Sequence, residues 1–293
     1  MTDTRVQGRD VSRWQGDINF DKMYSQGVRF VYCKASQQVA DSKFKEFYLQ
    51  AKDSGLYRGA YHYMDWRINE IDQAKLFVGT MGCDVGELPP MLDFEENPAT
   101  YGLTREQTVN KISAFLQYVE KATGRVPGIY TGYYFWQVWG TTSATWVKYP
   151  FWLAWWAPEW YIYLRTGGGN GAPKPWSKWT FWQYTAKLDG PTNGTQGLSV
   201  DGDIFNGSID ELKLFIAGGI IDPTKPPETY VVTSMTLKVF ASPSDSSKQV
   251  TYPLTFGTEV VVVQFITDAR GEKWANLESP VGWCRALYLQ KVA

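Results

Sequence analysis

The stretch that decides the fold runs from Leu88 to Glu96 and reads LPPMLDFEE. Two prolines open its apolar part, and the acids Asp93 and Glu95 stand where that part ends. A short apolar run bounded by turn residues is typical of a buried strand. We therefore expect a strand over residues 90–94 whose carboxyl end carries two carboxylates.

Helical patterns lie on both sides of this strand. Apolar residues recur at helical spacing before it and after it, and Thr104 and Gln107 form a capping box that starts the later helix. Strand-like runs alternate with these helices, which indicates βα units and a parallel sheet. The expected helices cover residues 44–55, 71–81 and 104–124, and the expected strands cover 30–33, 59–64, 90–94 and 126–131.

The helical periodicity fades after about residue 150. Two further strands are expected over residues 151–155 and 179–184, with a glycine-rich loop at 166–171 between them. The expected fold class is α/β, as an irregular TIM-like (β/α) barrel with a helix-poor second half. An open doubly wound sheet is the alternative, and the absence of a G-x-G-x-x-G turn weakens it.

The composition changes near residue 218, which predicts a second domain. Residues 219–229 contain three prolines among polar residues and read as a stiff linker. Residues 230–293 are rich in Val and Thr, show no helical stripe, and predict a small all-β barrel. The predicted organisation is a catalytic domain over 1–218, a Pro-rich linker over 219–229 and a small β domain over 230–293.

Charge and composition exclude several classes of protein. The 293 residues carry a formal net charge of -1, which argues against nucleic acid as a partner. No run of 18 apolar residues occurs, so membrane insertion is not expected. Three widely spaced cysteines and a single histidine predict buried thiols, no metal site and no cofactor. The first ten residues are polar, so we expect no signal peptide.

Aromatic residues are unusually frequent. The chain has 14 Trp, 18 Tyr and 15 Phe, and ten of the Trp lie between Trp136 and Trp182. One interpretation is a large aromatic core. The other is a carbohydrate site, because flat aromatic faces stack on the C–H faces of sugar rings.

Four acids can meet at one end of the barrel. Asp93 and Glu95 share a face, with Cα atoms about 6.6 Å apart if both lie in a strand. Asp10 stands at the start of the first expected strand and Asp201 near the end of the last, and these strands are neighbours in a closed barrel. Crowded carboxylates raise one another's pKa, as glycosidic hydrolysis requires. A solvated strand end is the alternative for the pair on its own, and the role of Asp203 stays open.

Residues 8–207 resemble glycoside hydrolase family 25, the lysozyme and muramidase family of phage and bacterial cell-wall enzymes. The similarity extends over about 200 residues in the order of the family's motifs. The matching segments are GRDVSRWQG (8–16), FVYCKAS (30–36), GAYHYM (59–64), LPPMLDFEE (88–96), GIYTG (128–132), FWLAWW (151–156), TFWQYT (180–185) and VDGDIFNG (200–207).

The resemblance implies cleavage of the β-1,4 bond between N-acetylmuramic acid and N-acetylglucosamine in bacterial peptidoglycan. By position, Glu95 matches the acid/base, Asp93 its partner carboxylate, and Asp10 and Asp201 the flanking aspartates. Asp93 either raises the pKa of Glu95 or steers the acetamido group of the substrate as an internal nucleophile. The resemblance favours net retention, although 6.6 Å lies between the separations of retaining and inverting pairs.

Substrate contacts are expected from side chains in the matching motifs near strand ends, each with core packing as the alternative. Tyr32 and Lys34 share one face of their strand, which we expect to be the barrel mouth. His62 alternates with its tyrosine neighbours and is expected to be a hydrogen-bonded structural residue. The candidate sugar contacts are Tyr32, Lys34, Tyr61, Tyr63, Tyr130, Trp152 and Tyr184.

Residues 230–293 resemble, less closely, the bacterial SH3-like domains of cell-wall hydrolases. The matching segments are LKV (237–239), GTEV (257–260), KWANL (273–277) and VGWC (281–284). This implies wall targeting by a tethered second site, with a spacer as the alternative.

Two rival functions remain from the sequence. One is a catalytically weak carbohydrate-binding or wall-binding protein. The presence of an acid at all four expected positions argues against it. The other is a wall amidase or peptidase, which a single His makes hard to build. The expected setting is phage-type: synthesis in the host cytoplasm, release to the cell wall and action outside the cell.

Overall fold

The computed structural model describes residues 5–166, 171–217, 228–241, 243, 249–267, 272–277 and 282–292. The chain divides into two compact units, residues 1–209 and 210–293. Residues 167–170 of the glycine-rich loop and residues 219–227 of the expected linker lie outside the described residues.

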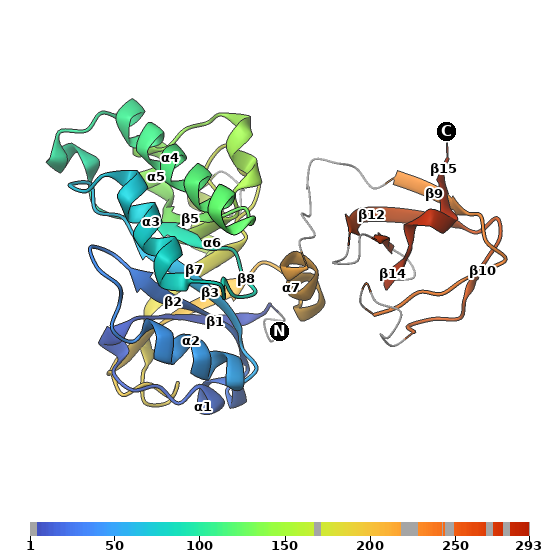
Figure 1. The fold of residues 1–293 in the computed structure, drawn as a ribbon, viewed down its shortest axis with the longest axis horizontal. Helices are drawn as coiled ribbons and strands as arrows, with labels where there is room; N and C mark the ends of the chain where they lie inside the picture. Colours follow the sequence, from blue (N-terminus) through green and yellow to red (C-terminus); the bar gives the residue numbers. More distant parts are fainter. Residues whose placement is uncertain are drawn as a thin grey trace. The chain divides into compact units, whose positions relative to one another are not determined.

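The first unit is a closed barrel of eight strands, so the open-sheet alternative is wrong (Figure 1). Strands β1 to β7 are parallel, but β8 is antiparallel to both of its neighbours, β7 and β1. The expectation of an all-parallel sheet is therefore wrong for the last strand. The strands are β1 (Gln7–Val11), β2 (Val28–Ser36), β3 (Tyr57–Tyr63), β4 (Met91–Asp93), β5 (Gly128–Gly132), β6 (Phe151–Ala154), β7 (Phe181–Asp189) and β8 (Ser199–Phe205).

Helices surround the first half of the barrel more fully than the second. The capping box at Thr104 starts the longest helix, α4, and Gly124 in the left-handed region ends it. Between β5 and β7 the two helices have only seven residues each, and no helix joins β7 to β8, so the helix-poor second half is confirmed. The helices are α1 (Phe20–Ser25), α2 (Phe44–Asp53), α3 (Glu70–Met81), α4 (Arg105–Thr123), α5 (Tyr133–Trp139) and α6 (Glu159–Arg165).

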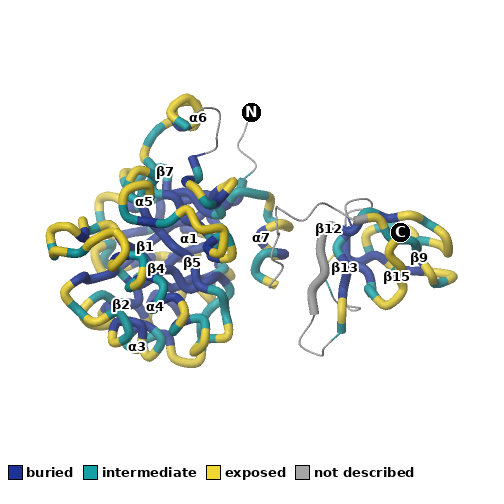
Figure 2. The backbone as a smooth tube through the Cα atoms, turned by 90° about the horizontal axis from the view of Figure 1, so that it is seen from above, coloured by how far each residue is buried: buried dark blue, intermediate teal, exposed yellow. Residues whose placement is uncertain are grey.

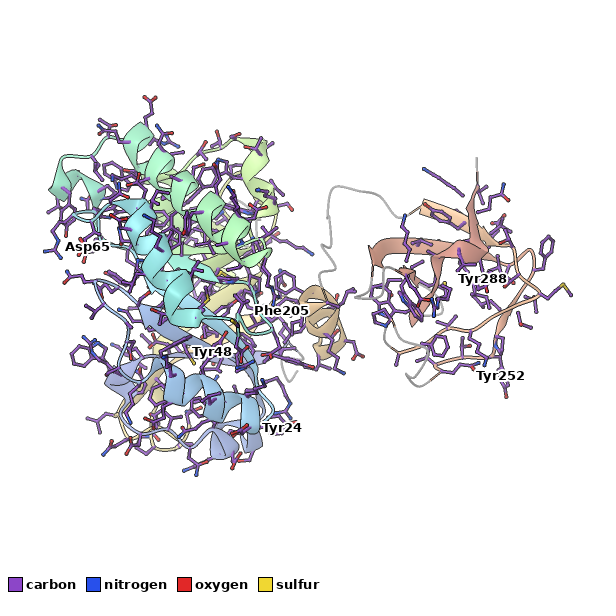
Figure 3. All side chains as sticks on the ribbon, viewed as in Figure 1. Tyr24, Tyr48, Asp65, Phe205, Tyr252 and Tyr288 are labelled. Atoms are coloured by element: carbon purple, nitrogen blue, oxygen red, sulfur yellow. The ribbon has the colours of Figure 1, made fainter. Side chains whose placement is uncertain are left out.

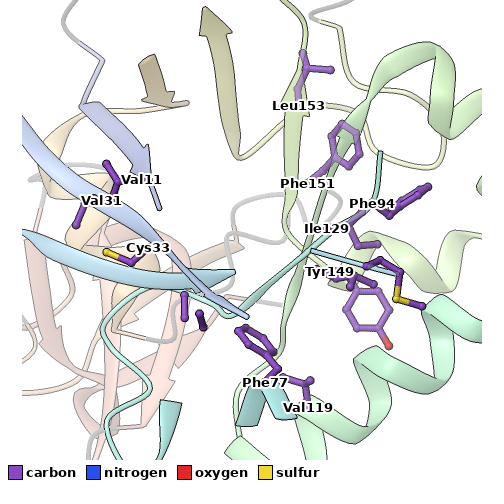
Figure 4. Close-up of a cluster of buried hydrophobic side chains, with 14 of the residues drawn as sticks. Val11, Val31, Cys33, Phe77, Phe94, Val119, Ile129, Tyr149, Phe151 and Leu153 are labelled. Carbon is purple, nitrogen blue, oxygen red and sulfur yellow. The ribbon is translucent and has the colours of Figure 1, made fainter. Parts of the chain in front are cut away.

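The main hydrophobic core lies between the outer face of the barrel and these helices. Val31 and Ile129 on the strands and Phe77 and Val119 on the helices are completely buried (Figure 4). Figure 2 shows the same division along the backbone, with buried strands enclosed by helices whose outer faces are exposed. This layer holds the strands in the register that brings their carboxyl ends together.

Aromatic rings fill the barrel interior because glycines on neighbouring strands leave room for them. A Cβ atom on Gly8 would lie 2.1 Å from the ring of Phe30, and one on Gly59 would lie 2.1 Å from the ring of Tyr32. Tyr32 in turn stacks on Trp152, with ring centroids 4.6 Å apart. The barrel interior is therefore filled with side chains, and the ring of Trp152 packs against the ring of Tyr32.

Most of the clustered tryptophans are packing residues. Six of the ten between residues 136 and 182 are buried, namely Trp136, Trp146, Trp152, Trp176, Trp179 and Trp182. Trp139 and Trp155 are partly buried against the core, whereas Trp156 and Trp160 are 60% and 65% exposed. The aromatic excess thus reflects mainly the core of the late barrel.

Arg58 is expected to be a major contributor to stability. Its guanidinium group is almost completely buried and donates to both carboxylate oxygens of Asp84 and of Glu87 at 2.8–3.1 Å. An Arg58→Ala substitution removes these bonds and leaves a cavity, so we expect it to lower the free energy of unfolding by about 3 kcal/mol. Lys75→Ala, which removes an exposed ion pair with Asp72, is expected to change it by under about 0.5 kcal/mol. Urea unfolding measures both, and equal effects would contradict this account.

All of α7 (Ile209–Ile216) except its first residue lies in the second unit, and the described residues after it form β-strands and one short 3-10 helix, Ala286–Tyr288. A five-stranded sheet has the order β14-β13-β12-β9-β15, and β10 pairs with β11. Val260 and Leu277 are among the buried residues of its small core. The strands are β9 (Glu228–Val232), β10 (Thr236–Leu237), β11 (Leu254–Thr255), β12 (Glu259–Thr267), β13 (Lys273–Leu277), β14 (Gly282–Arg285) and β15 (Leu289–Lys291).

Two further expectations concern the cysteines and the membrane. Cys33 and Cys284 are buried as expected, but Cys83 is exposed, because it follows the last turn of α3 at the surface. Within the described residues, no helix combines the length and apolarity needed to cross a bilayer.

Candidate active site

A pocket of about 190 Å³ opens in the barrel unit and brings together nine of the eleven residues expected at the site. These nine come from seven different strands or the residues just after them, and Gln183 on β7 adds the eighth, so the whole barrel contributes to this pocket. The lining residues are Asp10, Ser12, Trp14, Lys34, Tyr61, Tyr63, Asp93, Glu95, Tyr130, Trp152, Gln183 and Asp201.

Asp10 and Asp201 meet because the last strand is reversed. They are directly opposite in the antiparallel pairing of β1 with β8. Asp10 stands next to the end of β1 rather than at its start, and Asp201 stands near the start of β8 rather than at its end. The predicted meeting of the two acids is confirmed, while both predicted positions along the strands are wrong. In an antiparallel strand the early residues reach the edge where the parallel strands end.

Tyr32 and Tyr184 are the two expected residues that do not line this pocket. Tyr32 has no exposed surface, because Trp152 stacks on its ring inside the barrel. Tyr184 follows Gln183 on β7 and lies on the opposite face of the strand, outside the barrel. Its hydroxyl group donates to Gln7 at 3.4 Å, and its ring lines a separate cavity.

Gln183 is a site residue that the sequence reasoning missed. Its Nε2 donates to Asp10 at 2.8 Å and to Asp201 at 3.1 Å, while its Oε1 accepts from Tyr130 at 2.9 Å. The side chain therefore fixes two acids and one aromatic wall of the pocket. Side chains alternate along residues 181–184, so Gln183 lies on the same face as Phe181. This alternation could have predicted that Gln183 faces the barrel interior.

Asp93 and Glu95 form a coupled pair of carboxyl groups. Burial, and next the charge of Glu95, raises the pKa of Asp93 well above its ordinary value, against the opposing effect of Lys34. Burial also raises the pKa of Glu95, and a hydrogen bond with Asp93 opposes this rise. Such a bond requires a proton on one of the two groups. Both shifts favour the protonated forms, so the pair is suited to share a proton between an acid and a base.

Lys34 supplies positive charge beside this pair. Its ammonium group donates to Gln37 at 2.9 Å and lies 4.6 Å from the centre of the Tyr63 ring. Burial lowers the pKa of Lys34, although the charge of Asp93 opposes that effect. Lys34 therefore offsets part of the negative charge that the acids concentrate in the pocket.

A second group of carboxyls lies on the other side of the pocket. Burial, and next the charges of Asp201 and Asp203, raises the pKa of Asp10 well above its ordinary value. Burial raises the pKa of Asp201 to about 6 and that of Asp203 to about 7. Asp203 is completely buried, and one of its oxygens accepts a hydrogen bond from the indole N–H of Trp152 at 2.9 Å. Asp203 therefore fixes the indole ring of Trp152, which lines the pocket.

The burial of Asp203 makes its ionisation costly to the fold. Because its folded pKa of about 7 exceeds the ordinary value of 3.8, stability is lost as the pH rises between these two values. Asp203→Asn keeps an oxygen for Trp152 but does not ionise. We expect the variant's unfolding free energy, relative to the unmodified chain, to rise from pH 4 to pH 7. Urea unfolding at both pH values measures it, and a pH-independent difference would refute this assignment.

His62 is a structural residue, as expected. It is completely buried, its Nδ1 accepts from the Ser36 hydroxyl at 2.8 Å and its Nε2 donates to Gln73 at 3.0 Å. Burial lowers the pKa of His62 to about 4, so the ring stays neutral. In the described residues, no group of three His, Cys, Asp or Glu side chains is arranged to hold a metal ion.

Comparison with known proteins agrees with this geometry. Residues 9–192 match the family model of the glycosyl hydrolases family 25. The chain belongs to this family. Lysozyme M1 of Streptomyces globisporus is 36% identical over 220 residues, covering 71% of this chain and 70% of that protein. The N,O-diacetylmuramidase of Arthroderma benhamiae is 32% identical over 229 residues, covering 74% of this chain and 90% of that protein.

A solved structure supports the same assignment for the barrel unit. The bacterial lysozyme from Streptomyces coelicolor superposes with a TM-score of 0.62 at 32% identity, covering 73% of this chain and 98% of that one. The family 25 protein described here is therefore a glycoside hydrolase, and its acidic pocket is the candidate active site.

Proposed function

We propose that this glycoside hydrolase cleaves the β-1,4 bond between N-acetylmuramic acid and N-acetylglucosamine in bacterial peptidoglycan. The observation that carries the proposal is the coupled Asp93–Glu95 pair at the end of β4, in a pocket walled by aromatic rings. Glycosidic hydrolysis needs one carboxyl that donates a proton and a second that supports the developing positive charge. The lysozyme and muramidase relatives support peptidoglycan as the substrate.

In the proposed mechanism Glu95 acts as the acid and then as the base. It protonates the glycosidic oxygen as the bond from that oxygen to the sugar's C1 breaks. The acetamido oxygen of the same sugar attacks C1, while Asp93 holds the acetamido N–H and stabilises its positive charge. Glu95 then takes a proton from water, which adds to C1 and restores the acetamido group. Two inversions at C1 give net retention of configuration.

The other site residues have proposed roles in holding the substrate. Tyr61, Tyr63 and Tyr130 line the walls of the pocket, and Trp152 lies at its base, where they can contact one sugar ring. Gln183 fixes Asp10 and Asp201, and the charge of Asp201 favours the protonated form of Glu95. Lys34 is suited to donate a hydrogen bond to an oxygen of the substrate beside Tyr63.

The products of digestion test this function. Purified cell walls treated with the full chain should release fragments with new reducing ends, and the sugar at those ends should be N-acetylmuramic acid. New amino groups would instead identify an amidase or peptidase, and N-acetylglucosamine at the reducing ends would identify the other β-1,4 bond. Binding to walls without release of fragments would identify a catalytically weak wall-binding protein. Mass spectrometry of the fragments distinguishes these outcomes.

For the second unit we propose an SH3-like fold that binds the cell wall. Its antiparallel sheet and small apolar core support a β domain of this kind. A cavity of about 320 Å³ is lined by Tyr230, Lys273, Ala286, Leu287 and Leu289 and offers a binding surface. Exposed apolar residues lie elsewhere on the unit as well, including Tyr252 (Figure 3). A tethered wall-binding site would raise the effective concentration of the catalytic unit at its substrate.

Retention on walls tests the targeting proposal. The full chain carrying Glu95→Gln, which should not digest the walls, is sedimented with them. A further Leu287→Ser change at the cavity is expected to reduce the retained fraction, because Leu287 is 68% exposed there and its loss should not disturb the core. Met235→Ser, at a residue that is 81% exposed and does not line the cavity, is the control. Equal retention of both variants would count against this cavity as the binding surface.

A further inference from the structure

A second cavity, of about 570 Å³, lies on the outer side of the barrel unit. It occurs where β7 passes directly into β8 and no helix joins them. Outward-facing Trp182 and Tyr184 of β7, Ile204 of β8 and Gln7 of β1 form its wall. The start of α6 and the preceding residues Trp156 to Pro158, together with Arg5, complete it.

The side chains of this cavity are held in fixed orientations. The indole N–H of Trp182 donates to the backbone oxygen of Trp155 at 2.8 Å, and the Tyr184 hydroxyl group donates to Gln7. Arg5 makes two hydrogen bonds of 3.0 Å with the carboxylate of Glu159. Because these opposite charges are paired, the cavity suits an uncharged ligand with apolar faces and polar edges.

Trp156 connects this cavity with the active site. It lines the outer cavity, and its indole N–H donates to Oε1 of Gln183 at 2.8 Å. Gln183 lines the catalytic pocket and contacts Asp10 and Asp201 there. Trp156 is also 60% exposed, so it forms a rim between the two cavities rather than a buried partition.

We propose that the outer cavity is a distal subsite for an N-acetylhexosamine of the same glycan strand. This proposal rests on the proposed function, because it needs a polymeric sugar substrate in the catalytic pocket. That pocket, at about 190 Å³, holds only a small part of such a strand, whereas the outer cavity is three times larger. A glycan that passes over the exposed ring of Trp156 reaches the partly exposed ring of Tyr184, with Gln7 and Glu159 beside it for its hydroxyl and amide groups.

Substrate length is the variable that tests the distal subsite. The full chain is assayed on peptide-free glycan strands, both short ones that fill only the catalytic pocket and long ones that also reach over Trp156. Tyr184→Ala is expected to raise KM for long strands about tenfold, with kcat unchanged. It removes a contact that binds the ground state and the transition state equally. KM for short strands should stay the same. Tyr184→Leu, which keeps the bulk of the side chain but not the flat ring, should act in the same direction.

Tyr24→Ala is the matched control, since Tyr24 is an exposed tyrosine on α1 that does not line the cavity (Figure 3). It should leave KM unchanged for both lengths. Equal changes for short and long strands in the Tyr184 variants, or no change for either, would overturn the subsite. An effect seen only when stem peptides are attached would also overturn it, in favour of a peptide ligand. Failure of the unmodified chain to cleave any glycan would instead refute the proposed function.

Discussion

Glu95→Gln is expected to lower kcat on peptidoglycan by about 1000-fold. The amide has nearly the shape of the carboxyl group but has no proton to donate to the glycosidic oxygen and cannot act as a base. Burial and the neighbouring Asp201 raise the pKa of Glu95, which is the property that a proton donor near neutral pH requires. The amide is neutral, like the protonated carboxyl group that it replaces, so the fold should be retained.

Release of reducing ends from purified walls measures this loss, and thermal unfolding verifies that the variant is folded. Glu96→Gln is the matched control, because Glu96 is the next acid along the chain and its carboxylate accepts a hydrogen bond from Tyr101 instead of facing the pocket. Its activity should stay within about twofold of the unmodified chain, as expected for a residue without a role in proton transfer. Activity of folded Glu95→Gln near the unmodified level would reject Glu95 as the acid.

Asp93→Asn is expected to have the second largest effect, a fall in kcat of about 100-fold with little change in substrate binding. Asp93 is buried beside Glu95, and its negative charge is proposed to stabilise the positive charge that develops on the acetamido group. That charge develops mainly in the transition state, so its loss should affect kcat far more than KM. The amide keeps the size of the side chain and an oxygen that can still accept a hydrogen bond.

Separate determination of kcat and KM on peptide-free glycan strands tests this expectation. Calorimetric binding of the same strands to the doubly substituted Glu95→Gln, Asp93→Asn chain, compared with Glu95→Gln alone, isolates ground-state binding. An increase in KM with unchanged kcat would mean that Asp93 only holds the substrate, and the proposed role in charge stabilisation would be wrong.

The acidic end of β4 could be predicted from local sequence because one short motif determines it. The strand ends at Asp93, as the apolar run and the following acids indicate. The meeting of Asp10 with Asp201 also follows from topology, because closure of a barrel makes its first and last strands neighbours.

The direction of the last strand was missed although the chain contains a signal for it. Only nine residues, 190–198, connect β7 to β8, and three of them are glycines. A parallel connection needs a crossover of a dozen or more residues, whereas an antiparallel one can be short. Loop length therefore predicts the reversal, and the reversal determines which end of β8 carries a site residue.

Tyr32 and Tyr184 show two different limits of a pattern argument. Alternation along a strand predicts the face of a side chain but not its depth, so it could not show that Trp152 covers Tyr32. Tyr184 was expected near a strand end, but β7 continues to Asp189. Depth and strand length both depend on packing between segments that are distant in the sequence.

The pairing of β1 with β8 also governs when activity can appear during synthesis. Asp10 and Asp201 are about 190 residues apart in the chain, yet they are opposite one another in the sheet and share Gln183. Contacts between such distant residues form late, because they close the longest loop in the unit. A ribosome that has not yet released the β8 segment therefore carries a chain without a complete catalytic pocket. Activity therefore requires closure of the barrel, and partial translation products without β8 are not expected to hydrolyse the cell wall.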